Sequence, residues 1–200
     1  MISEGEIPMQ ELKERIRKEA KVLPGNIIKV DGFLNHRIDT ALMDHIAEEF
    51  GKHFNMDEVS VILTAEASGI ALSAIVARYF NKPMIFAKKA KSDNIEGGLY
   101  QSDIFSYTYK KKVTLLVSKE WLSSDDKVLV IDDFMANGEA MRGLCDIVTA
   151  AGATLVGIGC AVEKGFQGGG DRLRQNGVNL KSLAIIESAE PGNIVFRDEL

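Results

Sequence analysis

Runs of consecutive apolar residues alternate with helical segments along most of this chain, and this alternation constrains the fold more than any other feature. A strand that is apolar at every position is buried on both faces of its sheet. Such strands alternating with helices are typical of an α/β fold, an open parallel sheet with helices on both faces. The predicted strands are residues 27–30, 59–63, 84–87, 113–117, 128–131, 154–162, 183–186 and 194–196.

Apolar residues at helical spacing predict the helices between these strands. From Leu12 to Leu23 they recur at intervals of three and four, which predicts a helix ending before Pro24. Further helices are predicted at about residues 40–54, 70–80, 139–151 and 171–176. Three consecutive glycines at residues 168–170 predict a turn before the last helix.

Composition and charge limit the classes of protein that the sequence fits. Hydrophobic residues make up 46% of the 200 residues and charged residues 26%, the balance of a soluble globular chain. The formal net charge of −5 argues against binding nucleic acid or an anionic membrane over a wide surface. Cys145 and Cys160 lack CxxC spacing, so we expect neither a disulfide framework nor a zinc site, and a cytoplasmic location fits best.

The start of the chain differs from the rest. Residues 1–8 are acidic and have no signal-peptide pattern, and a helical pattern opens directly after them at Met9. We therefore expect residues 1–8 to be an extension outside the fold and residues 9–200 to form one domain.

One long segment, residues 88–112, interrupts the alternation of strands and helices. It has no sustained hydrophobic period, and it contains Gly97-Gly98 with scattered aromatic and polar residues. A connection of this length within a compact domain is usually either a functional lid or disordered. We predict a flexible loop that closes over a ligand.

Residues 128–140 combine features that suit a phosphate ligand. The predicted strand is followed by Asp132 and Asp133, and Asn137-Gly138 then makes a tight turn before a helix. The turn leaves backbone N–H groups at the positive end of the helix, where a phosphate monoester is stabilised. The two carboxylates suit sugar hydroxyls or a metal ion. Read alone, the same residues also fit an ordinary strand end and turn.

A second anion site is predicted after the strand at residues 59–63. Residues 64–69, Thr-Ala-Glu-Ala-Ser-Gly, form a loop of small residues that enters a helix, so their N–H groups suit a diphosphate. Lys88, Lys89 and Lys91 add positive charge at the end of the next strand. An ordinary Ser-capped helix and a solvated group of lysines are the alternative readings.

Residues 128–140 resemble the phosphoribosyl diphosphate (PRPP) signature of type I phosphoribosyltransferases: a hydrophobic strand, two acidic residues and a loop for the 5-phosphate. Most members have Thr-Gly-x-Thr in that loop, whereas this chain has Asn-Gly-Glu-Ala at residues 137–140. The run Asp-Asp-Phe-Met-Ala-Asn-Gly is similar instead to the xanthine phosphoribosyltransferase branch. Residues 30–36, 66–70, 86–92 and 163–167 support the resemblance, which extends from about Met9 to the C-terminus.

The resemblance implies a type I phosphoribosyltransferase fold, with a small hood over the base site from about residues 24–38 and 163–200 and a flexible loop at about 88–112. It implies a pentosyltransferase of purine salvage that converts xanthine and PRPP to xanthosine 5′-monophosphate and diphosphate with Mg²⁺. It also implies a homodimer, with no nucleic-acid or membrane partner.

Roles for individual residues follow from the same resemblance. Xanthine would be bound by Ile28, Asn35, Phe134 and Lys164, with Phe166 as a further candidate. PRPP would be bound by Asp132, Asp133, Ala136, Asn137, Gly138, Glu139 and Ala140. Its diphosphate would contact Ala65, Glu66, Ala67, Ser68, Gly69, Lys88, Lys89 and Lys91, with Ser106 and Tyr107 in the flexible loop. Mg²⁺ would be held mainly through PRPP, with Asp132 and Asp133 as candidate ligands.

Two other functions stay open on the sequence alone. A PRPP-binding regulator has the same fold without catalysis, but it would need a DNA-binding domain, and only 58 residues precede Val59. A guanine or adenine phosphoribosyltransferase would differ at the base site. Hypoxanthine–guanine relatives carry a further Asp where this chain has Ala136, so that candidate general base is missing. We expect Lys164 to select an anionic base instead.

Overall fold

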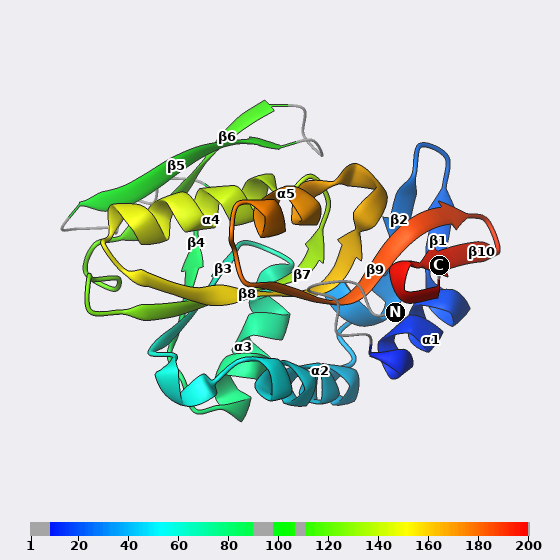
Figure 1. The fold of residues 1–200 in the computed structure, drawn as a ribbon, viewed down its shortest axis with the longest axis horizontal. Coiled ribbons are helices and arrows are strands. Elements are labelled where there is room, and N and C mark those ends of the chain that lie inside the picture. The colour runs from blue at the N-terminus through cyan, green and yellow to red at the C-terminus, as the bar shows by residue number, and fades with distance from the viewer. Residues whose placement is uncertain (1–8, 90–97, 107–110, 200) are drawn as a thin grey trace.

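The computed structural model describes residues 9–89, 98–106 and 111–199, and its centre is a six-stranded sheet (Figure 1). The strand order is β10-β9-β8-β7-β3-β4. The parallel strands are β3 (Val61–Ala65), β4 (Met84–Ala87), β7 (Lys127–Met135), β8 (Thr154–Lys164) and β9 (Leu180–Glu190), and β10 (Asn193–Phe196) is antiparallel to β9. The predicted mostly parallel sheet is confirmed.

Helices cover both faces of the sheet. In Figure 1, α2 (Thr40–His53) and α3 (Gly69–Tyr79) lie on one face, and α4 (Glu139–Ala150) and α5 (Gly169–Gln175) on the other. Leu129 and Ile131 of β7 pack in one hydrophobic cluster, whereas Val128 and Val130 pack in a second cluster. The strand is therefore apolar at successive positions because both of its faces are buried.

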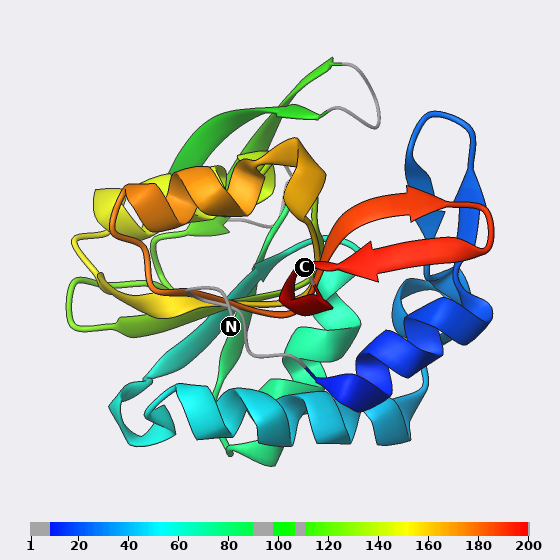
Figure 2. The same ribbon diagram turned by 45° about the vertical axis from the view of Figure 1, so that its right-hand side comes forward.

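The N-terminal region forms a helix and a hairpin, where a longer helix followed by a strand at residues 27–30 was predicted. Helix α1 (Gln10–Glu19) ends because Ala20 is extended, and β1 (Lys21–Leu23) then pairs antiparallel with β2 (Ile27–Lys29). Positive φ angles at Gly25 (+83°) and Asn26 (+60°) close the turn. In Figure 2 this hairpin lies beside β9 and β10, followed by a short π-helical segment at Asp31–Asn35.

Residues 99–118 form a second hairpin, which corrects the prediction of an irregular loop through residue 112. Strand β5 (Leu99–Ser106) pairs antiparallel with β6 (Lys111–Ser118), and residues 90–97 and 107–110 of the predicted loop lie outside the described residues. Burial alternates along β5, with Ser102 and Ile104 buried. These side chains face α4, where Ile104 lies against Gly143. The hydrophobic period is too weak to be recognised because polar Ser102 is on the buried side of the strand and apolar Phe105 is on the exposed side.

Three short 3₁₀ segments complete the described chain, at Met56–Glu58, Gly165–Gln167 and Arg197–Glu199. Within the described residues, no helix is long and apolar enough to cross a membrane.

Candidate active site

The candidate site lies at the carboxyl ends of β3 and β7, where the strand order of the sheet reverses. From β3 the chain passes to β4 on one side and later returns to β7 on the other. Ligands in open α/β sheets bind at such a reversal. Pairing of β3 with β7 stops at Leu63 and Val130, and β7 then continues beside β8 alone. The end of β7 is therefore open toward the loop that follows β3.

The predicted acidic pair lies inside β7 and not after its end. Asp132 pairs with Cys160 of β8, and the strand continues to Met135. The prediction ended this strand at residue 131 because carboxylates are unusual inside a buried strand unless they have a specific partner or ligand. Both side chains are buried, with 7% of Asp132 and 1% of Asp133 exposed.

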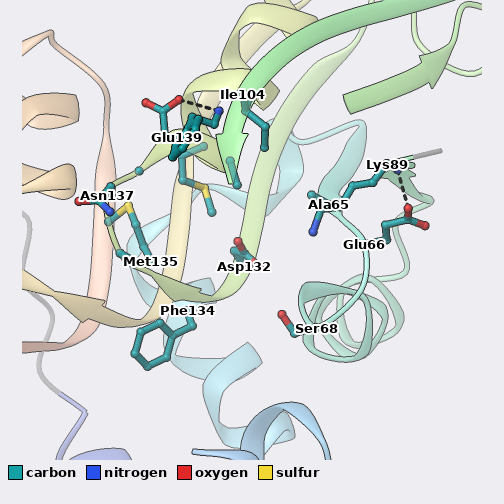
Figure 3. Close-up of a pocket in the computed structure, with 15 residues that line it drawn as sticks. Ala65, Glu66, Ser68, Lys89, Ile104, Asp132, Phe134, Met135, Asn137 and Glu139 are labelled. Carbon is teal, nitrogen blue, oxygen red and sulfur yellow. Dashed lines mark hydrogen bonds between the residues drawn. The ribbon is translucent and has the colours of Figure 1, made fainter. Parts of the chain in front are cut away.

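Figure 3 shows the pocket, which Asp132 lines between the β3 loop and the β7 loop, whereas Asp133 is not among the lining residues. The pocket is lined by Ala65, Glu66, Ser68, Lys89, Ile104, Phe105, Asp132, Phe134, Met135, Ala136, Asn137, Gly138, Glu139, Ala140 and Met141. Two loops of the kind that bind phosphate groups thus share one pocket with a buried carboxylate.

The two aspartates have different surroundings. Asp133 accepts hydrogen bonds from Asn35 Nδ2 (2.9 Å) and Ser68 Oγ (2.8 Å), so both of its oxygens have partners. Asp132 accepts only from the backbone N–H of Asp133 among the described contacts, and burial, together with the nearby Asp133 charge, raises its pKa. Asp132 therefore has room to accept a further hydrogen bond from a ligand or to bind a cation.

The loop after β3 approaches Asp132 closely at a glycine. A Cβ atom at Gly69 would lie 2.3 Å from Thr64 Oγ1 and 2.4 Å from Asp132 Oδ1, so no larger residue fits there without displacement. The Glu66 carboxylate accepts from the Lys89 backbone N–H, which joins this loop to the end of β4. Ala67 is exposed and does not line the pocket.

The structure describes two of the three predicted lysines, and only one of the two lines the pocket. Lys89 lines the pocket. Lys88 is half-buried, and its backbone pairs with Leu116 of β6. Lys91 and Tyr107 lie outside the described residues, and at Ser106 only the backbone is described.

The loop after β7 carries the second group of predicted residues. Gly138 has φ +78°, a conformation that favours glycine, and α4 begins at the next residue. The Glu139 carboxylate accepts from Arg142 Nη2 (3.1 Å) and from the Phe105 backbone N–H (3.3 Å). The hydrogen bond from Arg142 lowers the pKa of Glu139. This negative charge is therefore paired with Arg142 and hydrogen-bonded to the β5 hairpin.

The predicted base-binding residues lie beside the pocket. Lys164 Nζ donates to the Asn26 carbonyl (2.9 Å) and lies 5.4 Å from the centre of the Phe134 ring. Partial burial lowers the pKa of Lys164. Asn35 reaches the site through Asp133, whereas the Ile28 side chain is buried in the hydrophobic core. Only Phe134 of the four lines the pocket itself.

Several residues near the site were not predicted. Ile104, Phe105, Met135 and Met141 line the pocket, and Arg172 donates to the Asn137 carbonyl at 3.0 Å. Gly169 and Gly170 form the first turn of α5 and not a separate turn. The three consecutive glycines could have indicated this contact between α5 and the loop after β7, because glycines also allow two backbones to approach closely.

Comparison with known proteins agrees with this geometry. The chain matches the phosphoribosyl transferase domain family over residues 30–176, and it belongs to that family. The particular branch is that of the xanthine phosphoribosyltransferases. The protein of that name from Lachnoclostridium phytofermentans is 51% identical over 96% of this chain and 100% of its own length. The protein from Bifidobacterium adolescentis is 51% identical over 94% of this chain and 100% of its own length.

Solved structures show the same fold at lower identity. An adenine phosphoribosyltransferase from Giardia lamblia, complexed with 9-deazaadenine, has a TM-score of 0.73 at 22% identity and covers 86% of this chain and 96% of its own. One from Leishmania tarentolae has a TM-score of 0.71 at 18% identity, with 92% of each chain covered. The predicted type I phosphoribosyltransferase fold is confirmed.

Proposed function

We propose that this chain transfers the phosphoribosyl group of PRPP to xanthine in purine salvage. Xanthine N9 would bond to C1 of the ribose, and the bond from C1 to the diphosphate would break with its electron pair leaving on the diphosphate. The products are xanthosine 5′-monophosphate and diphosphate. The observation that carries the proposal is a pocket in which two loops suited to binding anions flank a buried carboxylate. The chain that forms it is 51% identical to a xanthine phosphoribosyltransferase.

The pocket has a separate place for each part of PRPP. Residues 136–140 present backbone N–H groups at the start of α4 for the 5-phosphate. The loop at residues 65–69, with Lys88, Lys89 and Lys91, would receive the diphosphate. Asp132 and Asp133 would accept hydrogen bonds from the ribose hydroxyls between them. Positioning and charge neutralisation of the leaving group would then supply most of the catalysis.

The same residues fit Mg²⁺ as a shared ligand of protein and substrate. Asp132 and Asp133 offer the hard oxygen donors that this ion prefers, and within the described residues no group of three or more His, Cys, Asp or Glu could hold a metal alone. Asp132 and Asp133 would therefore share the ion with oxygens of PRPP. When bound, Mg²⁺ neutralises charge on the departing diphosphate.

Base selection would depend on Asn35 and Lys164. A carboxylate only accepts hydrogen bonds, so the contact with Asp133 turns the Asn35 amide nitrogen inward. Its second N–H can then donate to the C2 oxygen of xanthine, where guanine has an amino donor. Lys164 would favour an anionic dioxopurine, with Phe134 beneath its ammonium group. Ile28, whose side chain is buried, would contribute through its backbone.

No side chain at residue 136 supplies a general base, because this position is alanine. We infer that the enzyme uses a base that is already ionised. Ile104 and Phe105 of the β5 hairpin line the pocket with apolar groups and would help to exclude water from the reacting carbon. The closing of the predicted loop, a homodimer and a cytoplasmic location remain predictions.

The direct test is to incubate the protein with PRPP, Mg²⁺ and xanthine, guanine, hypoxanthine or adenine in turn. We expect nucleotide from xanthine at the highest kcat/KM. Turnover only with another purine would reassign the base site. PRPP binding without any turnover would support the regulator.

A further inference from the structure

The peptide between Asn137 and Gly138 is held from outside the pocket by α5. Arg172 Nη2 donates to the Asn137 carbonyl at 3.0 Å, and Arg172 Nη1 donates to the Gln167 carbonyl at 3.4 Å. Arg172 is exposed and does not line the pocket. Its guanidinium therefore connects the loop after β7 with the segment after β8.

The direction of this carbonyl decides the direction of the next N–H. In a trans peptide the C=O group and the following N–H point in opposite directions. With the Asn137 carbonyl turned toward Arg172, the Gly138 N–H is turned away from Arg172. Gly138 lines the pocket, and its N–H makes no hydrogen bond within the part of the chain that the structure describes. This donor is left for a ligand.

Gly169 packs against the same peptide. A Cβ atom at Gly169 would lie 2.5 Å from the Ala136 oxygen, 2.5 Å from the Asn137 carbonyl carbon and 2.7 Å from the Gly138 nitrogen. The two backbones are thus in direct contact, and this leaves the Asn137–Gly138 peptide little room to rotate.

Helix α5, which carries Gly169 and Arg172, is itself fixed by a buried ion pair. Arg174 donates to both oxygens of Glu163 at 3.0 and 2.6 Å, and Glu163 is fully buried at the end of β8. Ser182 of β9 donates to the same carboxylate. The sheet therefore sets the position of α5, and α5 sets that of the loop.

We propose that Arg172 is a positioning residue for the 5-phosphate of PRPP: it holds the Asn137 carbonyl outward so that the Gly138 N–H faces the phosphate. This proposal rests on the proposed function, since it assigns the 5-phosphate to residues 136–140. Arg172 acts through the peptide and does not touch the substrate.

Binding of two partial ligands to the intact protein tests the proposal. Ribose 5-phosphate uses the loop at residues 136–140, whereas Mg-diphosphate uses the loop at residues 65–69. In Arg172→Ala we expect calorimetry to show ribose 5-phosphate affinity falling roughly 3- to 10-fold, the effect of one hydrogen bond. Mg-diphosphate affinity should not change. Arg172→Lys keeps the charge and one donor, so it should recover part of the loss.

A surface arginine provides the matched control. Arg78→Ala removes an exposed guanidinium on α3 that lies 3.8 Å from Asp44, and both affinities should stay at the wild-type value. An equal loss of both ligands in Arg172→Ala, or no loss of either, would overturn the proposal. Steady-state kinetics should show a raised KM for PRPP with an unchanged KM for xanthine.

These measurements separate the proposal from the function on which it rests. If wild-type protein binds ribose 5-phosphate but converts no purine, the proposed transferase activity fails while the role of Arg172 is still measured. If the wild type is active and Arg172→Ala binds ribose 5-phosphate normally, only the role of Arg172 fails.

Discussion

At the scale of single residues, the site depends on polar side chains whose partners fix their orientation. Asp133 joins Asn35 of the π-helical segment to Ser68 of the β3 loop. A substitution at Asn35 would therefore change both the proposed contact with the base and the position of Asp133. Asn35→Asp would place a second carboxylate within hydrogen-bond distance of Asp133, so its effect on base choice would be mixed with charge repulsion.

Asn35→Ala is the cleaner variant for base selection. Loss of the donor should lower the ratio of kcat/KM for xanthine to that for guanine by roughly 5- to 150-fold, from about 1–3 kcal/mol for one unpaired group. Kinetics with the two bases at saturating PRPP measures the ratio. Ser68→Ala is the matched control, because it removes the other contact to Asp133 and should leave the ratio unchanged. An unchanged ratio in Asn35→Ala would mean that this amide does not read C2.

If Lys164 contacts xanthine as proposed, it should make xanthine binding depend on pH. Its lowered pKa means that the ammonium loses its proton at a lower pH than an ordinary lysine, whose value is 10.5. We therefore expect kcat/KM for xanthine to fall as the pH rises through this lowered pKa. In Lys164→Arg the guanidinium stays charged over this range because its pKa is far higher than that of a lysine, so the profile should stay level there.

Comparing the two proteins at each pH cancels the ionisation of xanthine itself. Lys164 contacts the Asn26 carbonyl and the Phe134 ring. The nearby acidic residue on β9 is Glu187, which follows the strand partner of Lys164, Ile186, and its carboxylate is bound to Arg197. If kcat/KM for xanthine falls equally at high pH in wild type and Lys164→Arg, Lys164 does not cause that fall.

At the scale of secondary-structure elements, the β5–β6 hairpin is joined to α4 by polar contacts. Arg142 donates to the Asp103 carbonyl (2.8 Å) and to Asp146 (2.7 Å), and Ser102 Oγ donates to the same Asp146 (2.8 Å). Arg142 also pairs with Glu139 at the start of α4. The position of the hairpin over the pocket is thus linked to the loop that would bind the 5-phosphate.

Arg142→Ala should loosen the hairpin from α4. Local opening exposes backbone to proteases, so we expect trypsin to cleave after Lys111 or Lys112 several times faster than in wild type, as judged by mass spectrometry of the fragments. Arg78→Ala serves as the control for removing one trypsin site elsewhere. Equal cleavage rates in all three proteins would show that Arg142 does not hold the hairpin.

At the scale of the whole molecule, the first helix and the end of the chain pack together. Lys13 is nearly fully buried and contacts Asp198 (2.7 Å) and Glu199 (3.1 Å), and Lys13 and Arg17 lie over the Phe196 ring at 5.0 and 4.8 Å. Helix α1 and residues 196–199 therefore pack against each other at one end of the sheet (Figure 2).

This contact should weaken in acid. Burial raises the pKa of Glu199, but hydrogen bonds from Arg17 and Lys13 outweigh that effect and lower the pKa to about 2. A carboxylate with a lowered pKa stabilises the fold above its ordinary pKa, near 4.5, and this stability is lost as the pH falls toward 2. In Glu199→Gln, the Tm should therefore fall less between pH 5 and about pH 3 than in wild type. Parallel Tm curves for the two proteins would contradict this.

Much of the site could be predicted because its residues are adjacent in the sequence. The pocket contains Glu66, Ser68, Lys89, Asp132 and the run from Phe134 to Ala140, and most of these residues belong to the end of a buried strand or to the segment that directly follows one. Buried strands are recognised by their composition, and loops after parallel strands meet at one edge of the sheet.

Other parts depend on contacts between distant segments and could not be predicted. Arg172 reads as a surface residue, and only the position of α5 brings it to the Asn137 carbonyl. The buried side of β5 includes Ser102, which donates to Asp146 of α4, and this polar residue among the buried positions hides the strand period. Helix α1 ends at Glu19 because residues 21–23 gain a pairing partner in residues 27–29, whereas local periodicity alone favours a longer helix.

The amino-acid sequence by itself determined the alternation of strands and helices, the family and the two loops of the pocket, because these follow from local hydrophobic pattern and from short runs of residues. The tertiary structure decided which side chains come together around the site: Asp133 contacts Asn35, α5 brings Arg172 to the loop after β7, and α4 contacts the hairpin. Asn35 and Asp133 are 98 positions apart in the sequence, and Asn137 and Arg172 are 35 positions apart. Hydrogen bonds over such separations depend on where the folded elements lie in space, and no local sequence pattern encodes that placement.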